Sequence, residues 1–255
     1  MTQFWRKPDL LVLHGSHLFG CATPESDVDH RGFVVEPGEF LVGRKAFEQH
    51  EDRENDVVIY GAPKFFKLLE KGAPNCIEIL FAPQENILEC SELGQMVLDN
   101  RDLFVTKKLT QAIRGFASSE WRAAQLLHKD KETGEVRHST RVVGARRKES
   151  YAKHGYSTKN AYHAIRLLDE GVELLRSGTV TFPRPNVEEL HGIRNGEIPF
   201  EELAERREQL AQDFMEAEEG TSLPEATDRQ AVSDLYSKVV SRSVRAHLEA
   251  VERKK

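Results

Sequence analysis

Near residue 92 the spacing of the apolar residues changes, and this change constrains the fold more than any other feature of the sequence. Before it, short apolar runs such as DLLVLHG and DVVIYG alternate with turns that contain glycine or proline, which is typical of buried strands. After it, apolar residues recur three and four positions apart, as in amphipathic helices. We therefore predict an α+β fold, with a small mixed β-sheet domain over residues 1–100 and an all-helical domain over 101–255.

The same patterns predict individual elements. In the first domain we expect strands over residues 9–14, 28–35, 56–61 and 75–83, helices over 16–20 and 63–71, and a hairpin or variable loop over 36–54. In the second domain we expect helices over residues 104–128, 158–177, 199–217 and 228–252, and an exposed loop over 129–138.

Composition excludes several classes of protein. The sequence has no apolar run approaching the roughly 20 residues that span a bilayer, and the N-terminus lacks the features of a secretory signal, so we expect a cytoplasmic protein without a membrane partner. A net charge of −6 argues against a protein that coats duplex nucleic acid. The charge is uneven, however, because the segment Arg137–Arg166 holds eight Lys or Arg residues and one acid, and this segment is a candidate for contact with phosphate.

The stretch HGSHLFG places a glycine and a serine between a strand and the start of a helix. The first backbone N–H groups of a helix have no partner within the helix, and the helix dipole is positive at this end. Gly15 and Ser16 are therefore candidates for binding phosphate, and Gly20 permits close approach of the backbone. No Gly-Lys-Ser/Thr follows, so the stretch is not a Walker loop, and one glycine pair does not make a dinucleotide-binding fingerprint.

Two aspartates follow at a spacing of two residues, in SDVDHRGFVV. Side chains alternate along a strand, so Asp27 and Asp29 would project from one face if the strand begins there. Two carboxylates held this close repel each other unless a cation lies between them, and Mg²⁺ prefers oxygen ligands together with substrate phosphates. The pair therefore predicts a site for Mg²⁺ (or Mn²⁺), and we expect Arg31 to pair with one aspartate or with the γ-phosphate.

A third carboxylate is expected near this pair, since two-metal transfer uses one more acid. Glu78 is the first candidate because it is the single acid in the apolar run NCIEILFAP, where an unpaired charge would be costly. Asp56, at the start of DVVIY, is the second candidate. A structural alternative for Glu78 is that it faces an arginine of the helical domain.

The helix expected from Thr158 carries three basic side chains on one face. Lys159, His163 and Arg166 are spaced by four and three residues, and apolar residues fill the opposite face. A cationic stripe of this kind would neutralise a triphosphate and a pyrophosphate leaving group. A solvated face without a ligand remains an alternative, and His163 is a poor candidate for binding a metal that prefers oxygen.

The order Gly-Ser, Gly, then Ser-Asp-x-Asp resembles the core motif of the DNA polymerase β-like nucleotidyltransferases, here GSHLFG and SDVD. Two later segments, PNCIEILFAP and the run from KHGYSTKNAYHAIRLL to LHGIRNG, resemble motifs of a branch of predicted nucleotidyltransferases found in bacterial RNA-repair gene neighbourhoods and in phages. The three motifs span most of residues 10–200. One departure is Ser157, where that branch often has an aspartate after Gly-Tyr.

The resemblance implies a palm-like first domain and an enzyme that transfers a nucleoside monophosphate from an NTP to an acceptor hydroxyl, possible acceptors being an RNA end, a small molecule and a protein. It implies that Asp27, Asp29 and Glu78 are catalytic metal ligands. It also implies that the nucleotide is bound by the residues Gly15, Ser16, Ser26, Lys159, His163 and Arg166. The alternatives are a catalytically silent nucleotide or RNA sensor on the same fold and a purely structural helical adaptor.

Overall fold

The computed structural model describes residues 3–43, 45–125, 127–129, 136–138 and 145–253. The chain divides into two compact units. The first comprises Met1–Leu109, Thr181–Pro185 and Pro224–Lys255, and the second comprises Thr110–Val180 and Asn186–Leu223. The sequence predicted one boundary near residue 100, whereas the C-terminal helix groups with the sheet-containing unit and a five-residue segment from the middle of the chain does the same.

The first unit is built on a five-stranded mixed sheet in the order β3-β4-β2-β1-β5. Its strands are β1 (Leu10–Leu13), β2 (His30–Val34), β3 (Gln49–Asp52), β4 (Val57–Gly61) and β5 (Ile87–Cys90). The central pair, β2 and β4, is parallel, and the other pairs are antiparallel. The start of β2 therefore lies beside the start of β4 and beside the end of β1, so three chain segments meet at one end of the sheet.

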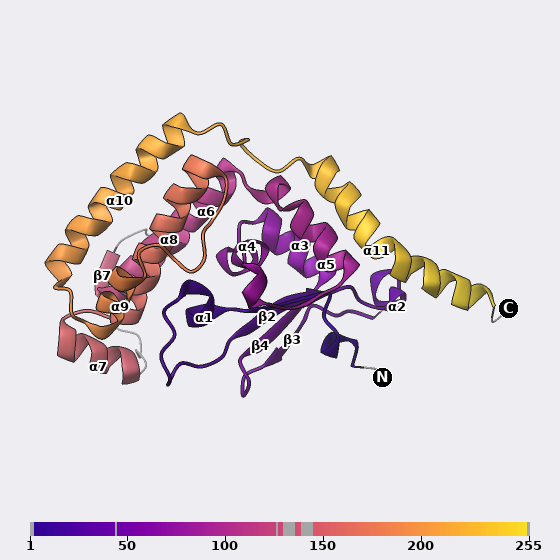
Figure 1. Cartoon of the computed structure of the whole chain (residues 1–255), viewed down its shortest axis with the longest axis horizontal. Coiled ribbons are helices and arrows are strands. Elements are labelled where there is room, and N and C mark those ends of the chain that lie inside the picture. Colours follow the sequence, from indigo (N-terminus) through magenta and orange to yellow (C-terminus); the bar gives the residue numbers. More distant parts are fainter. Residues whose placement is uncertain (1–2, 44, 126, 130–135, 139–144, 254–255) are drawn as a thin grey trace. The chain divides into compact units, whose positions relative to one another are not determined.

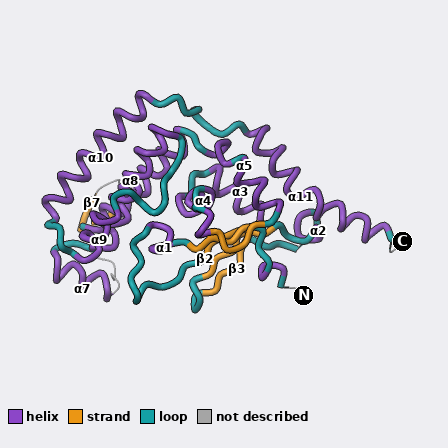
Figure 2. The backbone as a smooth tube through the Cα atoms, in the orientation of Figure 1, coloured by secondary structure: helices purple, strands orange, loops and turns teal. Residues whose placement is uncertain are grey.

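Helices cover one side of this sheet (Figures 1 and 2), where α3, α4 and α5 lie together. The α-helices of the unit are α1 (Gly15–Phe19), α2 (Gly38–Leu41), α3 (Ala62–Glu70), α4 (Pro74–Leu80), α5 (Glu92–Asp99) and α11 (Arg229–Glu252). Phe33 of β2 stacks on Phe65 of α3, with ring centroids 4.7 Å apart. Phe66 of α3 meets Tyr236 of α11, so the C-terminal helix completes this core.

Among the described residues, the second unit consists of helices, their connections and one short pair of antiparallel strands. Its elements are α6 (Lys107–Ala124, which belongs to this unit from Thr110), β6 (Leu127–Lys129), β7 (Val136–His138), α7 (Ala145–His154), α8 (Thr158–Ser177), α9 (Val187–Asn195) and α10 (Phe200–Gly220). Helix α8 packs against α9 and α10. Val172, Leu175 and Phe214 form part of the buried apolar core between α8 and α10. None of the described helices is long and apolar enough to cross a bilayer.

The α+β fold class predicted from the sequence is confirmed, and the helix predicted over 158–177 has the observed bounds. The strand predicted over 75–83 is wrong, because this segment forms α4. Proline in the first turn favours a helix start, and a short apolar run does not by itself distinguish a buried strand from a buried helix. The helix predicted over 104–128 ends at Ala124, and within the loop predicted over 129–138 the residues 130–135 lie outside the described residues.

Candidate functional site

The Gly15-Ser16 turn follows directly from β1. His14 has an extended backbone, and Gly15 then adopts a φ of +61°, in the left-handed region that glycine populates without strain. The predicted helix start is confirmed, but α1 has only five residues. It ends at Gly20, a left-handed residue whose N–H donates to the carbonyl groups of Ser16 and His17. The segment is therefore a tight turn between two strands and not a long helix.

The two aspartates lie immediately before β2 and not on it, because the strand begins at His30. Asp27 is exposed and Asp29 is partly exposed. Before them, Thr23 and Ser26 close a turn in which the Ser26 hydroxyl accepts a hydrogen bond from the Thr23 N–H at 2.9 Å. Because neither aspartate lies on the strand, the alternation of side chains along a strand does not determine whether Asp27 and Asp29 project from the same face.

Asp29 and Gly15 are brought into direct contact. The backbone oxygen of Asp29 accepts a hydrogen bond from the N–H of His14 at 2.8 Å, which extends the β1–β2 pairing by one step. A Cβ placed on Gly15 would overlap with Oδ2 of Asp29. Glycine is therefore required at this position both by its backbone conformation and by the aspartate that lies over it.

Arg31 faces the same carboxylate from β2. Its Nη2 lies 3.6 Å from Oδ1 of Asp29, and both side chains are about one quarter exposed. The expectation that Arg31 pairs with one of the aspartates is confirmed. The pair is accessible to solvent and so contributes little to stability, but it places a cation beside the predicted metal ligand.

Glu78 forms a buried pair with His14. The Nε2 atom of His14 lies 3.0 Å from Oε2 of Glu78, and both side chains are less than 5% exposed. Glu78 lies on α4, not on a strand, and is flanked by the buried residues Ile77 and Ile79. The residue chosen as third carboxylate is thus connected to the residue that precedes Gly15.

Asp56, the other candidate for the third carboxylate, lies in the turn between β3 and β4. Its φ of +48° is unusual for a residue other than glycine, and its side chain is exposed. Its backbone oxygen accepts a hydrogen bond from the N–H of His30 at 2.9 Å. Because β2 and β4 are parallel, Asp29 and Asp56 directly precede paired residues at the same end of the sheet.

In the helical unit the three predicted basic residues differ in their surroundings. Lys159 is exposed and His163 is partly buried. Arg166 is 3% exposed and pairs with Glu170 one turn later, at 2.5 Å between Nη1 and Oε1. The expected position of all three on α8 is confirmed, but they do not form a uniformly exposed stripe.

Ser157, which replaces an expected aspartate, is buried at the start of α8. Its hydroxyl donates to Oδ1 of Asn160 at 2.7 Å, and its backbone N–H donates to Ala124 of α6. Nδ2 of Asn160 in turn donates to Glu120 of α6 at 2.6 Å. In this chain the position therefore anchors the start of α8 on α6.

Comparison with known proteins places the chain in a family. The RNA repair pathway DNA polymerase beta family, RlaP, matches it over residues 10–238. The chain belongs to this family. The match covers both units, and it supports the nucleotidyltransferase fold that the RlaP family shares with the DNA polymerase β group.

A phage protein shows a more limited similarity. The "Uncharacterized 38.9 kDa protein in nrdC-mobD intergenic region" of Enterobacteria phage T4 is 31% identical over 108 residues, which cover 37% of this chain and 32% of that protein. The match thus spans about a third of the phage protein. No solved structure matches the chain.

The structure shows which residues near the RlaP motifs could bind a metal ion. In the parts of the chain that the structure describes, no three or more His, Cys, Asp and Glu residues are grouped so that they could hold a metal ion. Burial raises the pKa of the nearby Cys76 thiol to about 12, so this thiol stays protonated at neutral pH and is not a nucleophile. Asp27, Asp29 and Asp56, which precede β2 and β4, are carboxylates that solvent can reach.

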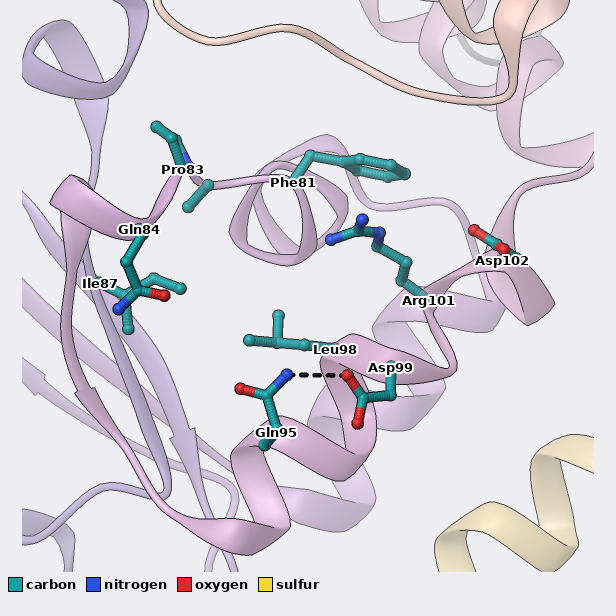
Figure 3. A pocket seen from close by; sticks show the side chains of 10 residues that line it. Phe81, Pro83, Gln84, Ile87, Gln95, Leu98, Asp99, Arg101 and Asp102 are labelled. Atoms are coloured by element: carbon teal, nitrogen blue, oxygen red, sulfur yellow. Dashed lines mark hydrogen bonds between the residues drawn. The ribbon is translucent and has the colours of Figure 1, made fainter.

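A separate cavity of about 620 Å³ lies in the first unit (Figure 3), where the segment after α4 faces α5. The guanidinium of Arg101 lies over the ring of Phe81, 5.4 Å from its centroid. Gln95 donates to Asp99 at 2.8 Å on another wall. None of the residues predicted to form the RlaP site lines this cavity.

Sequence reasoning missed the connection between His14 and Glu78. The signal was present, since a lone acid in an apolar run needs a partner when it is buried. The partner could not be named from the sequence, because residues as far apart as His14 and Glu78 show no local spacing that links them. Of the basic segment Arg137–Arg166, Arg141 lies outside the described residues, and Lys153 and Lys159 are exposed.

Proposed function

We propose that the protein is a divalent-metal-dependent nucleotidyltransferase. It transfers a nucleoside monophosphate from an NTP to an acceptor hydroxyl. The hydroxyl oxygen forms a bond to the α-phosphorus, the bond from that phosphorus to the oxygen bridging to the β-phosphorus breaks, and pyrophosphate leaves. The hydroxyl proton passes to solvent or to a nearby base. Membership of the RlaP family supports this reaction class.

The observation that carries the proposal is the contact between Gly15 and Asp29. Two motifs separated by a turn in sequence meet at one end of the sheet, and a carboxylate lies directly over the glycine of the Gly-Ser pair. A purely structural helical adaptor would not need a partly exposed carboxylate held over a glycine turn at the end of a sheet. Backbone N–H groups at the start of a helix, next to a carboxylate that solvent can reach, suit a ligand that carries phosphate and a metal ion.

The residues present fit Mg²⁺ or Mn²⁺. Mg²⁺ is bound through one or two carboxylates together with substrate phosphates and water, and Asp27 and Asp29 supply two carboxylates accessible to solvent. When bound, the metal would neutralise charge on the phosphates and lower the pKa of the attacking hydroxyl. The third carboxylate predicted from sequence, Glu78 or Asp56, is not needed for this minimal ligand set.

The chain's own groups would orient the nucleotide. Gly15 and Ser16 would contact phosphate oxygens through backbone N–H groups, and Arg31 would hold Asp29 in place from β2. The prediction that Ser26, Lys159, His163 and Arg166 also bind the nucleotide stays a prediction. Arg166 would have to exchange its contact with Glu170 to take part.

An RNA end is the acceptor that we propose first. The matched family is described as belonging to an RNA repair pathway, and the segment Arg137–Arg166 is strongly basic. A small molecule or a protein hydroxyl would use the same reaction. A silent sensor would bind nucleotide without releasing pyrophosphate, so turnover separates it from an enzyme.

The test is incubation of the protein with each labelled NTP, Mg²⁺ or Mn²⁺, and total cellular RNA or extract. We expect pyrophosphate release and label on one class of acceptor. Asp27→Asn and Asp29→Asn should each lower the rate about 10³-fold, because removing the charge of a metal ligand removes stabilisation of the developing phosphate charge. Asp234→Asn is the matched control, since Asp234 is exposed on α11, away from the site.

Nucleotide binding without pyrophosphate release in any mixture would favour the sensor. Full activity in both aspartate variants would overturn the assignment of the site. Thermal unfolding of each variant should match the wild type within a few degrees, because both carboxylates are accessible to solvent.

A further inference from the structure

The pair between His14 and Glu78 connects the end of β1 to α4 through two buried polar side chains. His14 lies between β1 and α1, whereas Glu78 lies on α4. The side chains are 4% and 3% exposed, and Nε2 of His14 is 3.0 Å from Oε2 of Glu78. Burying two such polar groups is costly, and a buried pair is weak support for stability but a means of fixing one arrangement.

His14 is also attached to the rest of the proposed site. Its backbone N–H donates to the backbone oxygen of Asp29 at 2.8 Å. Its ring meets the ring of Phe19 edge-on, at 5.7 Å between centroids. The next residue is Gly15, over which the Asp29 carboxylate lies. A displacement of His14 would therefore move the glycine turn and the carboxylate together.

Glu78 is held by the core of the first unit. Its neighbours on α4, Ile77 and Ile79, are 2% and 0% exposed, and Glu78 itself is 2% exposed. Asp27, in contrast, is open to solvent. A carboxylate fixed in this way has the properties of an anchor for a second residue, and it lacks the access to solvent that Asp27 and Asp29 have.

We propose that Glu78 is a positioning residue that acts through His14. The pair holds the Gly15 turn beneath Asp29 in the geometry that binds metal and nucleotide, and Glu78 is not itself a metal ligand. This inference rests on the proposed function. It replaces the role of third carboxylate, predicted from the sequence, with a role one contact further from the metal.

The proposal predicts different results for two substitutions of Glu78. In Glu78→Gln the amide keeps the size of the carboxylate and can place its oxygen against Nε2 of His14, so binding of Mn²⁺ and kcat should stay within about threefold of wild type. In Glu78→Ala the anchor is lost, and both should fall about 10- to 100-fold, as is typical when a residue that orients a ligand is removed. A direct metal ligand would instead be lost in both variants.

The measurement is Mn²⁺ binding, followed by electron paramagnetic resonance, in the presence of the α,β-methylene analogue of ATP, CTP, GTP or UTP in turn. Pyrophosphate release gives kcat and KM for the same variants. Asp29→Asn marks the loss expected for a ligand. Glu36→Gln is the control, because Glu36 is an equally buried carboxyl of the same unit, 1% exposed, that accepts a hydrogen bond from the N–H of Ala62 at the start of α3.

A double-substitution cycle tests whether Glu78 acts through His14. His14→Ala and Glu78→Ala should each weaken Mn²⁺ binding, and the double variant should be no weaker than the worse single variant, since each change removes the contact between His14 and Glu78. Additive losses would overturn the proposal. If Glu78→Ala fails to fold, as judged by circular dichroism, the comparison of Glu78→Gln with Asp29→Asn still decides the question.

Each result has one meaning. Loss of Mn²⁺ binding in Glu78→Gln equal to that in Asp29→Asn would show a ligand and overturn the positioning role. Wild-type binding and kcat in Glu78→Ala would also overturn it, while the proposed function stood. A wild-type protein that neither binds Mn²⁺ with nucleotide nor releases pyrophosphate would overturn the proposed function, and the positioning role with it.

Discussion

The two ends of β2 place carboxylates in opposite environments. At its start, Asp29 is partly exposed, lies over a glycine and faces Arg31. Just beyond its end, Glu36 is 1% exposed and accepts a hydrogen bond from the N–H of Ala62, the first residue of α3. The first carboxylate is partly open to solvent, as the proposed site requires, and the second is enclosed by the fold.

Burial also affects the protonation of Glu36. Burial raises the pKa of Glu36 from 4.5 to about 7, despite hydrogen bonds from backbone N–H groups that lower it. A carboxyl in this environment favours its neutral form and is suited to the interior. We therefore expect substitutions of Asp29, before β2, to alter activity, and substitutions of Glu36, after β2, to alter stability.

The largest effect is expected from Gly15→Ala. The new methyl group would collide with Asp29, and alanine disfavours the backbone conformation of Gly15. We expect kcat/KM for pyrophosphate release to fall about 10²- to 10³-fold, because displacement of a reacting group by roughly 1 Å has an effect of this size.

Gly115→Ala on α6 is the matched control for that substitution. No atom lies within 4 Å of the position that its Cβ would take. It should leave activity unchanged and stabilise the helix by about 1 kcal/mol. Wild-type kcat/KM in Gly15→Ala would contradict the assigned site.

The second effect is a pH dependence of stability that comes from Glu36. Its pKa in the folded state is above the value of 4.5, so the folded state binds the proton more tightly than the unfolded state. The contribution is fully present below about pH 4.5 and is lost as pH rises to about 7. It amounts to about 3 kcal/mol.

Glu36→Gln should remove this dependence. In urea unfolding, the difference in free energy of unfolding between wild type and variant should change by about 3 kcal/mol across that pH range, with the wild type losing stability toward pH 7. Parallel pH profiles would show that Glu36 does not titrate as proposed. Activity at fixed pH should change little.

The smallest effect is expected in the helical unit. A Cβ on Gly171 of α8 would lie 2.6 Å from Cε2 of Phe214 and 3.5 Å from Cγ2 of Ile113. Gly171→Ala should therefore lower the free energy of unfolding by about 1–2 kcal/mol, since overpacking outweighs the gain in helix propensity. Unfolding in urea, with Gly115→Ala as control, measures it. A stabilised variant would show that Phe214 can move aside.

The sequence predicted some elements of the structure better than others. The bounds of α8 follow from spacing alone, because a long amphipathic segment repeats its signal over five turns. The segment over 75–83 carries too few residues to show a period, and the proline in the first turn of α4 was the local signal that favoured a helix. Helices α5 and α9, each under ten residues, were not predicted for the same reason.

The candidate site, too, was predicted only in part from the sequence. The Gly-Ser and Asp-x-Asp motifs identified the residues that meet at the end of the sheet, and the family match covers them. The motifs did not reveal that both aspartates precede β2. Nor did they reveal that Glu78 is turned toward His14, because this depends on how α4 packs beneath the turn.

By itself the sequence determined the fold class, the long helices and the motif in which Gly15 and Asp29 stand, because these depend on periodicity and on residue types that are close in the chain. The tertiary structure alone decided which buried polar groups pair and where the C-terminal helix packs. Pairing in the interior depends on contacts between distant segments, and local sequence carries no record of those contacts. Glu78 is the clearest case, since only the packing of α4 shows that the carboxylate predicted as a metal ligand lies beside His14.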